Sequence, residues 1–309
     1  MEAVDEVPAV IAAANLTSAG SHHASAALAA VDTLIERGFT ICDIVADRAY
    51  NMAKADTWTL ALAERAIDAV FDLAKRQRGT HPGKKTGTIL IDGTLFADSL
   101  PKHLRHLPSH HEVTGSAETL DLTNLYDKRM AFAYKPMQRN DGRTRYRGPI
   151  RADRVNSRIR CANYPYSLRA PQDRPTTTCT AGEPCGCGGT VTLEDNHFPN
   201  IRQRNAYGTT AWHKDYHRRN LVETANSQIR LPGALRRGYT RVFGRIKNAL
   251  LIGFTIFAHN HHCIVNFYRA RSLPIPNQFT VIDPVATESA PADINLPSRN
   301  EPQGRASPG

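Results

Sequence analysis

The segment DYHRRNLVETANSQIR, Asp215–Arg230, carries four side chains whose types and spacing could do chemistry. On a helix of about 3.6 residues per turn they share one narrow stripe, which holds Tyr216, Arg219, Glu223 and Arg230. A carboxylate can hold a divalent cation, and guanidinium groups can bind phosphate oxygens. A solvated helix face with ion pairs explains the same charges, so the stripe alone leaves both interpretations open.

A second candidate carboxylate is Asp47, which ends the apolar stretch ICDIVAD. A carboxylate that leaves the carboxyl end of a buried strand is placed to bind a hard cation. The alternative is an aspartate that caps the following turn, which is common. Asp47 alone does not decide between the two.

Four of the six cysteines lie close together in the chain, and they are Cys161, Cys179, Cys185 and Cys187. In a reducing compartment such a group argues against a disulfide framework and leaves a metal site open. The spacing departs from common zinc motifs, because C-x-C replaces C-x2-C and Cys161 stands apart. The two interpretations are a structural zinc site and free thiols in a loop.

Composition favours a polyanionic partner. The 309 residues include 39 Lys and Arg against 29 Asp and Glu, a net charge of +10. The acidic start MEAVDEVPAV lacks the positive charge of a signal peptide, and the longest apolar run is about half the length of a membrane span. We therefore expect a cytoplasmic protein without membrane contact. The sequence holds no P-loop, G-x-G-x-x-G or G-x-S-x-G motif, which leaves nucleotide-binding and hydrolase classes without support.

The first 75 residues or so alternate between strand and helix patterns, which is typical of an α/β sheet. The expected elements are a strand at 8–16, a helix that ends before Gly38, a strand that ends at Asp47, a helix, and a strand within 67–74. The stretch 87–98 predicts two strands around the turn dipeptide Asp92-Gly93. Helices are expected from Thr210 and over 239–268, with a break at 232–233. The tail from 284 onward has a disordered composition.

The two acidic stretches together resemble DDE transposases of bacterial insertion sequences. The C-terminal signature of this family is Y-x2-R-x3-E-x6-K/R, and the opening stripe fits it with Arg230 in place of the usual Lys. The strand IVADRAY is similar to the family's second acidic motif. The segment from Tyr207 to Arg230 resembles transposase-like proteins of actinobacteria, and the likeness extends from Pro8 to about Ser272.

This resemblance implies an α/β fold with an RNase H-like mixed sheet flanked by helices. It also implies a large insertion before the C-terminal catalytic helix. Asp47 and Glu223 would be catalytic and would hold Mg²⁺ for two-metal cleavage and transfer of DNA strands. Arg219 and Arg230 would contact phosphates, and Tyr216 would position or stack against the strand being cut. DNA, as transposon ends and target, is the expected partner, with a homodimer as the candidate assembly.

The resemblance also sets the expected domain boundaries. Residues 1–80 would form a partial RNase H-like core, 81–205 a basic insertion with the cysteine knuckle, 206–272 the helices that complete the core, and 273–309 a disordered tail. The family needs a third, earlier acid, and none is evident. Asp92 stands in a suggestive IDGT context, but it follows Asp47 in the chain.

We therefore expect an N-terminally truncated and inactive transposase. One alternative is a non-catalytic nucleic-acid-binding protein with a zinc knuckle. Another is an RNase H-like nuclease that recruits Asp5 or a different acid.

Overall fold

The computed structural model describes residues 8–18, 23–150, 157–230 and 242–279. The described residues fall into two compact units, one within Ile11–Ile256 and the other from the described parts of Met1–Val10 and Phe257–Gly309. Every described strand belongs to the first unit. The break expected at 232–233 and the tail from 284 onward lie outside the described residues.

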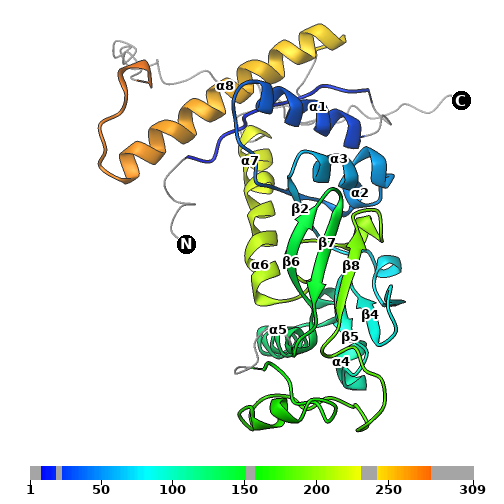
Figure 1. Ribbon diagram of the computed structural model, residues 1–309. Coiled ribbons are helices and arrows are strands. Elements are labelled where there is room, and N and C mark those ends of the chain that lie inside the picture. Colours follow the sequence, from blue (N-terminus) through cyan, green and yellow to red (C-terminus); the bar gives the residue numbers. More distant parts are fainter. Residues whose placement is uncertain (1–7, 19–22, 151–156, 231–241, 280–309) are drawn as a thin grey trace, which may run out of the picture. The chain divides into compact units, whose positions relative to one another are not determined.

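The chain is mixed α/β, with its strands in small sheets (Figure 1). The α-helices are α1 (His23–Glu36), α2 (Arg48–Asn51), α3 (Thr59–Glu64), α4 (Lys102–Arg105), α5 (Ser116–Arg129), α6 (Thr210–Tyr216), α7 (Asn220–Arg230) and α8 (Arg245–Ala270). The strands are β1 (Asp43–Ala46), β2 (Asp68–Phe71), β3 (Thr80–Pro82), β4 (Thr88–Ile91), β5 (Thr94–Ala97), β6 (Lys135–Asn140), β7 (Arg143–Arg147) and β8 (Thr190–Glu194).

Strands β1 and β2 form a parallel pair, with α2 and α3 in the connection between them. Helix α1 packs on this unit through Ala24 and Val31, which share a small apolar cluster with Trp58 and Leu62. The β-α-β alternation expected for this region is confirmed from α1 onward. The strand expected at 8–16 is wrong, because described residues 8–18 contain no strand. Short Ala-rich stretches suit helix or coil as well as strand, so periodicity could not decide there.

Strands β3, β4 and β5 form an antiparallel sheet, and the hairpin expected around Asp92-Gly93 is confirmed. Both turn residues have positive φ, 47° and 81°, which suits Asp and Gly better than other residues. A Cβ on Gly93 would lie 1.7 Å from the carbonyl oxygen of Ile201, so only glycine fits there.

Strands β6, β7 and β8 form a second antiparallel sheet in that order. Pro136 lies on the edge strand β6 next to a register shift, where a missing N–H costs the ladder least. The cysteine-bearing loop leads directly into β8.

One large core joins parts of the chain that the sequence assigns to different segments. It contains Phe71 from β2, Leu90 from β4, Phe132 after α5 and Trp212 from α6. The expected insertion therefore shares its apolar packing with the strands and helix on either side. This common core fixes α6 against β2.

Candidate functional site

Two aspartates follow neighbouring parallel strands at the same sheet edge. The pairing Ala46↔Phe71 ends the ladder between β1 and β2, and the next residues are Asp47 and Asp72. The Asp47 side chain is 55% exposed, whereas that of Asp72 is 2% exposed. Asp47 also accepts a hydrogen bond from the backbone N–H of Arg48 at 2.6 Å, so it caps α2. The capping interpretation is therefore correct, and it leaves the second carboxylate oxygen available.

Helices α6 and α7 follow one another along one axis, joined by the short 3-10 helix η8 (His217–Arg219) (Figure 1). Two contacts hold this rod against the β1–β2 pair. The indole N–H of Trp212 donates to the carbonyl of Phe71 at 3.0 Å. Arg218 pairs with Asp43 at 2.8 Å. These contacts place the first turn of α7 beside the strand ends.

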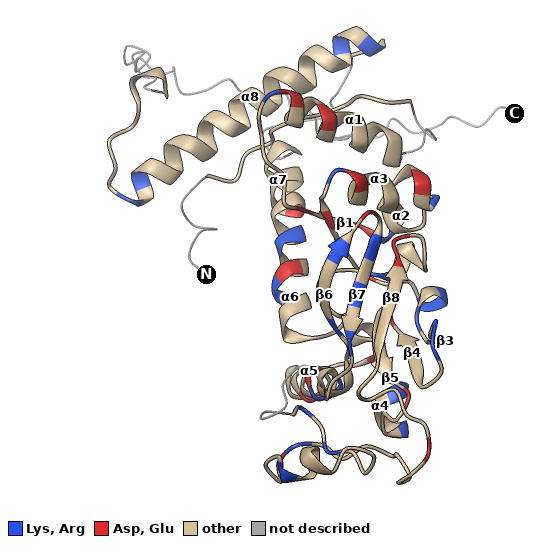
Figure 2. Ribbon diagram, in the orientation of Figure 1, with Lys and Arg blue, Asp and Glu red and all other residues tan. Residues whose placement is uncertain are grey.

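Arg219 links the two carboxylates that the sequence singles out. One guanidinium nitrogen of Arg219 lies 3.0 Å from a Glu223 oxygen and 3.8 Å from an Asp47 oxygen. The structure thus brings Asp47, Arg219 and Glu223 together, although Asp47 and Glu223 are far apart in the chain. Acidic and basic residues alternate along this part of the α6–α7 rod in Figure 2.

Tyr216 lies in the same place but is anchored by the core. Its ring stacks on Trp212, with centroids 4.8 Å apart and planes 11° apart. Burial and the nearby Asp72 carboxylate raise the pKa of Tyr216. One ring face is therefore covered by protein. Arg230 is the last residue of α7, two turns beyond Glu223, and its side chain lies outside the described part of the chain.

Asp72 is the residue that sequence reasoning missed. Its Oδ2 accepts hydrogen bonds from Arg48 at 2.7 Å and from His111 at 2.9 Å. Its buried Oδ1 has no hydrogen-bond partner. Burial alone would lower the pKa of Arg48, but the Asp72 carboxylate raises it. The stretch IDAVFD carries the same signal as ICDIVAD, an apolar strand that ends in Asp, and could have revealed this acid.

Asp47, Asp72 and Glu223 are the residues at this edge that could hold a divalent cation. Each is paired with an arginine or a histidine in the structure, and a cation would compete with those pairs. The orphaned Oδ1 of Asp72 is a buried acceptor that a cation could satisfy. Among the described residues, four cysteines are the only group of three or more such side chains whose ligand atoms lie close enough together to hold a metal ion. The three carboxylates at this edge do not form such a group.

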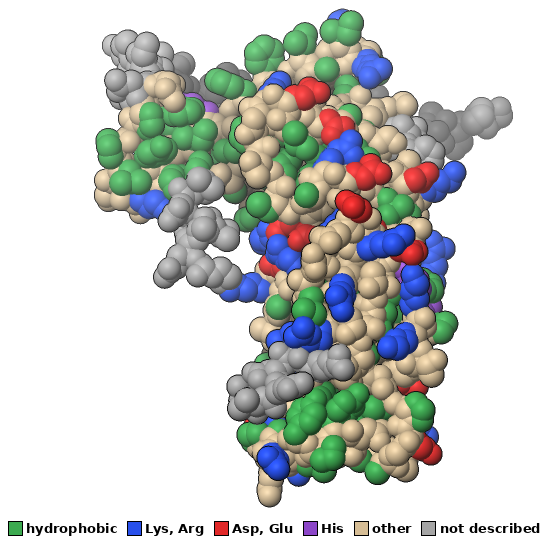
Figure 3. All heavy atoms as spheres, in the orientation of Figure 1, with side chains coloured by type: hydrophobic (Ala, Val, Ile, Leu, Met, Phe, Trp, Pro, Cys, Tyr) green, Lys and Arg blue, Asp and Glu red, His purple; other side chains and the backbone are tan. Residues whose placement is uncertain are grey.

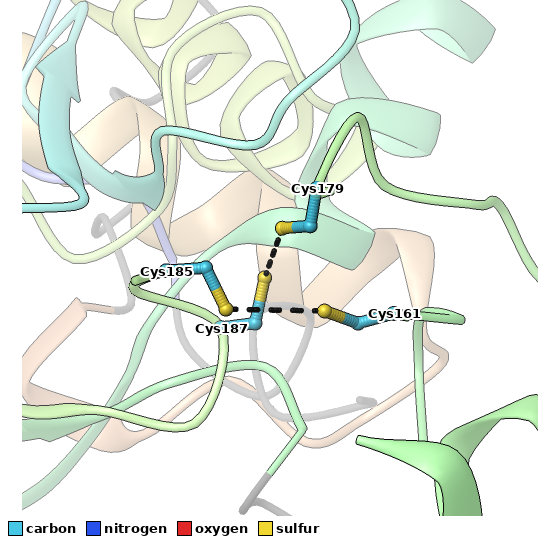
Figure 4. A group of neighbouring side chains, drawn as sticks. All are labelled: Cys161, Cys179, Cys185 and Cys187. Carbon is cyan, nitrogen blue, oxygen red and sulfur yellow. Dashed lines mark hydrogen bonds between the residues drawn. The ribbon is translucent and has the colours of Figure 1, made fainter. Parts of the chain in front are cut away.

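The four cysteines singled out by the sequence form one cluster. The sulfurs of Cys161, Cys179, Cys185 and Cys187 all lie within 4.8 Å of one another and point toward a common centre (Figure 4). Two of the separations are 3.9 Å for Cys161–Cys185 and 3.6 Å for Cys179–Cys187. Four thiolates at about 2.3 Å around one tetrahedral ion would be about 3.8 Å apart. The cluster could therefore hold a metal ion.

Close packing explains the glycines of the C-G-C-G loop. A Cβ on Gly186 would lie 1.9 Å from the carbonyl oxygen of Gly87, so a side chain there would push the cluster apart. Burial raises the pKa of Cys161 to about 11 and also raises the pKa of Cys187. A coordinated metal ion reverses this effect, because it deprotonates a coordinating thiol outright.

A row of arginines marks the outer face of the β6–β7–β8 sheet. Arg143, Arg145 and Arg147 alternate with Thr144 and Tyr146 along β7, and the two intervening residues face inward. Lys and Arg colour β6 and β7 in Figure 2, and basic side chains are spread over this face in Figure 3. The surface suits a polyanion through its charge.

A pair of half-buried histidines, His110 and His213, lies close to Asp72. His110 Nε2 lies 2.9 Å from His213 Nε2, so one ring must donate and the other accept. Burial, with His213, Arg78 and His111 nearby, lowers the pKa of His110 from 6.5 to about 4, and Asp72 offsets this only in part. The neutral pair is therefore the state that fits the fold.

We expect stability to fall as pH falls from 6.5 to about 4. In that window His110 is protonated in the unfolded chain and neutral in the folded chain. The contribution of His110 to stability is therefore fully present above pH 6.5 and is lost progressively as the pH falls below it. The loss should be on the order of 1–3 kcal/mol. Urea unfolding at about pH 7.5 and about pH 5 measures it, and His110→Gln should reduce the difference to the share of His213, whose pKa burial also lowers. An equal pH dependence in the variant would contradict this account.

Comparisons with protein-family models, curated proteins and solved structures give no significant match to this chain. Among the described helices, none combines the length and the apolar character that crossing a membrane requires.

Proposed function

We propose that this protein belongs with the DDE transposases and acts on DNA through divalent cations held at the carboxyl ends of β1 and β2. One observation carries the proposal. Asp47 and Asp72 follow neighbouring parallel strands, and α7 brings Glu223 to Asp47 through a shared contact with Arg219. In this interpretation β1, β2 and the α6–α7 rod correspond to part of an RNase H-like core.

Asp72 changes the expectation of an inactive chain. It supplies a third carboxylate at the same edge, although it follows Asp47 in the chain where the family's order places an earlier acid, and we propose that the three together bind metal. Bound Mg²⁺ would activate the attacking oxygen and stabilise the leaving oxygen. Arg48 and Arg219 hold the carboxylates in place until a cation binds, and their guanidinium groups can then meet phosphate oxygens.

Nicking of supercoiled plasmid with Mg²⁺ or Mn²⁺ tests this proposal. Asp47→Asn, Asp72→Asn and Glu223→Gln should each lower the rate at least about 100-fold, because each removes a charged metal ligand. Glu118→Gln is the matched control, since Glu118 is exposed in the first turn of α5 and should leave the rate unchanged. Cleavage that persists in all three variants would contradict the proposal.

A second candidate function is non-catalytic binding of nucleic acid, and the arginine row on β7 favours it. Folded protein that does not cleave but binds duplex DNA with a steep salt dependence would support this alternative. That affinity should then be the same in Glu223→Gln, because the carboxylates would only pair with arginines.

We propose that the four-cysteine cluster binds zinc. Thiolate ligands in a tetrahedral set are the usual structural site for Zn²⁺, and the 3.6 and 3.9 Å sulfur separations support that geometry. All described cysteines are free thiols. The ion would fix the loop before β8 to the segment around Cys161, under either of the two functions.

A further inference from the structure

A cleft of about 580 Å³ opens between β2 and the inner face of the β6–β7–β8 sheet. Its lining includes Asp68 and Ala69 from β2 and Tyr146 and Leu193 from the sheet, but none of the three carboxylates of the proposed metal site. The volume lies in the range of small-molecule sites, about 300–1,000 Å³. The cleft is therefore large enough for a ligand of its own.

The lining is strongly basic. It has two carboxylates, Asp68 and Asp195. Its cationic residues are Lys135, Arg139, Arg158, Arg202 and Arg204. Asp195 pairs with Arg139 at 2.8 Å, and Asp68 lies 3.6 Å from Arg204. The two acids are thus engaged, and positive charge remains in the cleft.

Arg202 is held by neutral groups. Its guanidinium donates to the backbone carbonyl of Glu194 at 2.7 Å and to the hydroxyl of Tyr146 at 3.0 Å. The ion pairs between described residues at this cleft involve Arg139 and Arg204, and none of them involves Arg202. The contacts with neutral groups fix the side chain but leave its charge uncompensated, which prepares it for an anion.

Arg158 shares this property and is more deeply placed. It donates to the carbonyls of Met130 at 3.0 Å and Ala133 at 2.5 Å, and its buried Nε–H has no partner. Burial without a carboxylate lowers the pKa of its guanidinium. A desolvated cation is costly unless a counter-ion reaches it, so this residue also favours a bound anion.

Much of the remaining lining is apolar, beside polar residues such as Thr59, Gln138 and Gln203. It includes Leu60, Ile67, Leu95, Met130 and Leu193. An inorganic anion would leave this wall unused, whereas a phosphate joined to a sugar and base would cover it. The combination matches a nucleotide unit.

We propose that this cleft binds a nucleotide unit, with its phosphate at Arg158 and Arg202 and its sugar or base against the apolar wall. The unit can belong to a DNA strand or be a free nucleotide, and both present the same chemistry. The inference stands apart from the proposed metal site, because the cleft could bind a nucleotide in a protein that cuts nothing.

Fluorescence anisotropy with a labelled single strand of about 12 nucleotides, and calorimetry with deoxynucleoside monophosphates, test the proposal. Arg202→Gln should weaken binding about tenfold, because it removes one charge-assisted contact. Gln138→Glu puts a negative charge on an exposed cleft residue of β6 without changing its shape, and should weaken binding to a similar extent. Arg37→Gln is the control, since it removes the same charge from an exposed residue just after α1 that belongs to neither the cleft lining nor the arginine row on β7.

Weakened binding of both ligands in the two cleft variants would support a nucleotide pocket. Weakened binding of the single strand alone would support a cleft that takes strand phosphates. Wild-type affinity in both cleft variants, an equal loss in Arg37→Gln, or no binding of either ligand by the wild-type protein would overturn the inference. Plasmid nicking, measured separately, reports on the metal site whichever result is obtained.

Discussion

Asp92→Asn is expected to lower the free energy of unfolding by about 3–5 kcal/mol. Asp92 is 3% exposed and lies in the β4–β5 turn. Its Oδ2 accepts from Arg129 at 3.1 Å, and its Oδ1 accepts from the backbone N–H of Gly79 at 3.0 Å. Arg129 is 1% exposed, and no other described carboxylate lies within 4.0 Å of it. Removing the Asp92 charge leaves a buried cation without a counter-ion.

The change to asparagine removes the negative charge without disturbing the turn. Asparagine tolerates the positive φ of 47° and preserves size, so the hairpin geometry survives the change. Asp98→Asn is the matched control, because Asp98 follows β5 but is half-exposed and pairs with Arg105 at the surface. That change should cost at most about 1 kcal/mol. Chemical denaturation compares the two, and similar losses would contradict a structural role for Asp92.

Asp92 also shows how a sequence context can mislead. The IDGT stretch resembles a catalytic motif, but its carboxylate is buried and bound to Arg129, and its side chain is remote from solvent. The same dipeptide gives a correct local prediction, because a turn depends on the backbone preferences of Asp and Gly. Local geometry could be read from the residues, whereas the partner of a buried charge is set by chain segments far away.

The same difference between local pattern and tertiary contact applies to the candidate sites. The strand that ends at Asp47 and the helix that carries Glu223 follow from apolar pattern and spacing. Their approach through Arg219 depends on the core that holds Trp212 against β2, which no local pattern contains. Asp72 was missed although IDAVFD carries the same signal as ICDIVAD, and only its burial beside Arg48 and His111 is a tertiary property that no local pattern contains.

The cysteine cluster was uncertain for the opposite reason. Its spacing departs from common zinc motifs, yet the folded loop brings all four sulfurs within 4.8 Å. Common zinc motifs describe ligands carried on one short loop. Here Cys161 lies in a separate segment, which pairs with the cysteine-bearing stretch through a β-bridge between Arg160 and Thr176. The cluster therefore forms through contact between segments that are distant in the chain, which motif spacing does not describe.

Removal of zinc is expected to destabilise the protein by about 4 kcal/mol at zinc concentrations a thousandfold above Kd. The ion would tie Cys161 and Cys179 to the loop that leads into β8, and these segments share the large core. Purified protein should carry one zinc ion per chain. A chelator should lower the unfolding midpoint, and Co²⁺ substitution should give the visible absorption of tetrahedral thiolate coordination.

The matched variants are Cys161→Ser and Cys42→Ser. Cys161 is buried in the cluster, whereas Cys42 is exposed and precedes β1, so only Cys161→Ser should lose both zinc and stability. The chelator should then have no further effect on Cys161→Ser, because its ion is already absent. Unchanged stability of the wild-type protein in chelator, or equal losses in both variants, would show that the cluster is four closely packed thiols that bind no zinc. Since thiol packing alone does not respond to chelation, the two explanations separate in one titration.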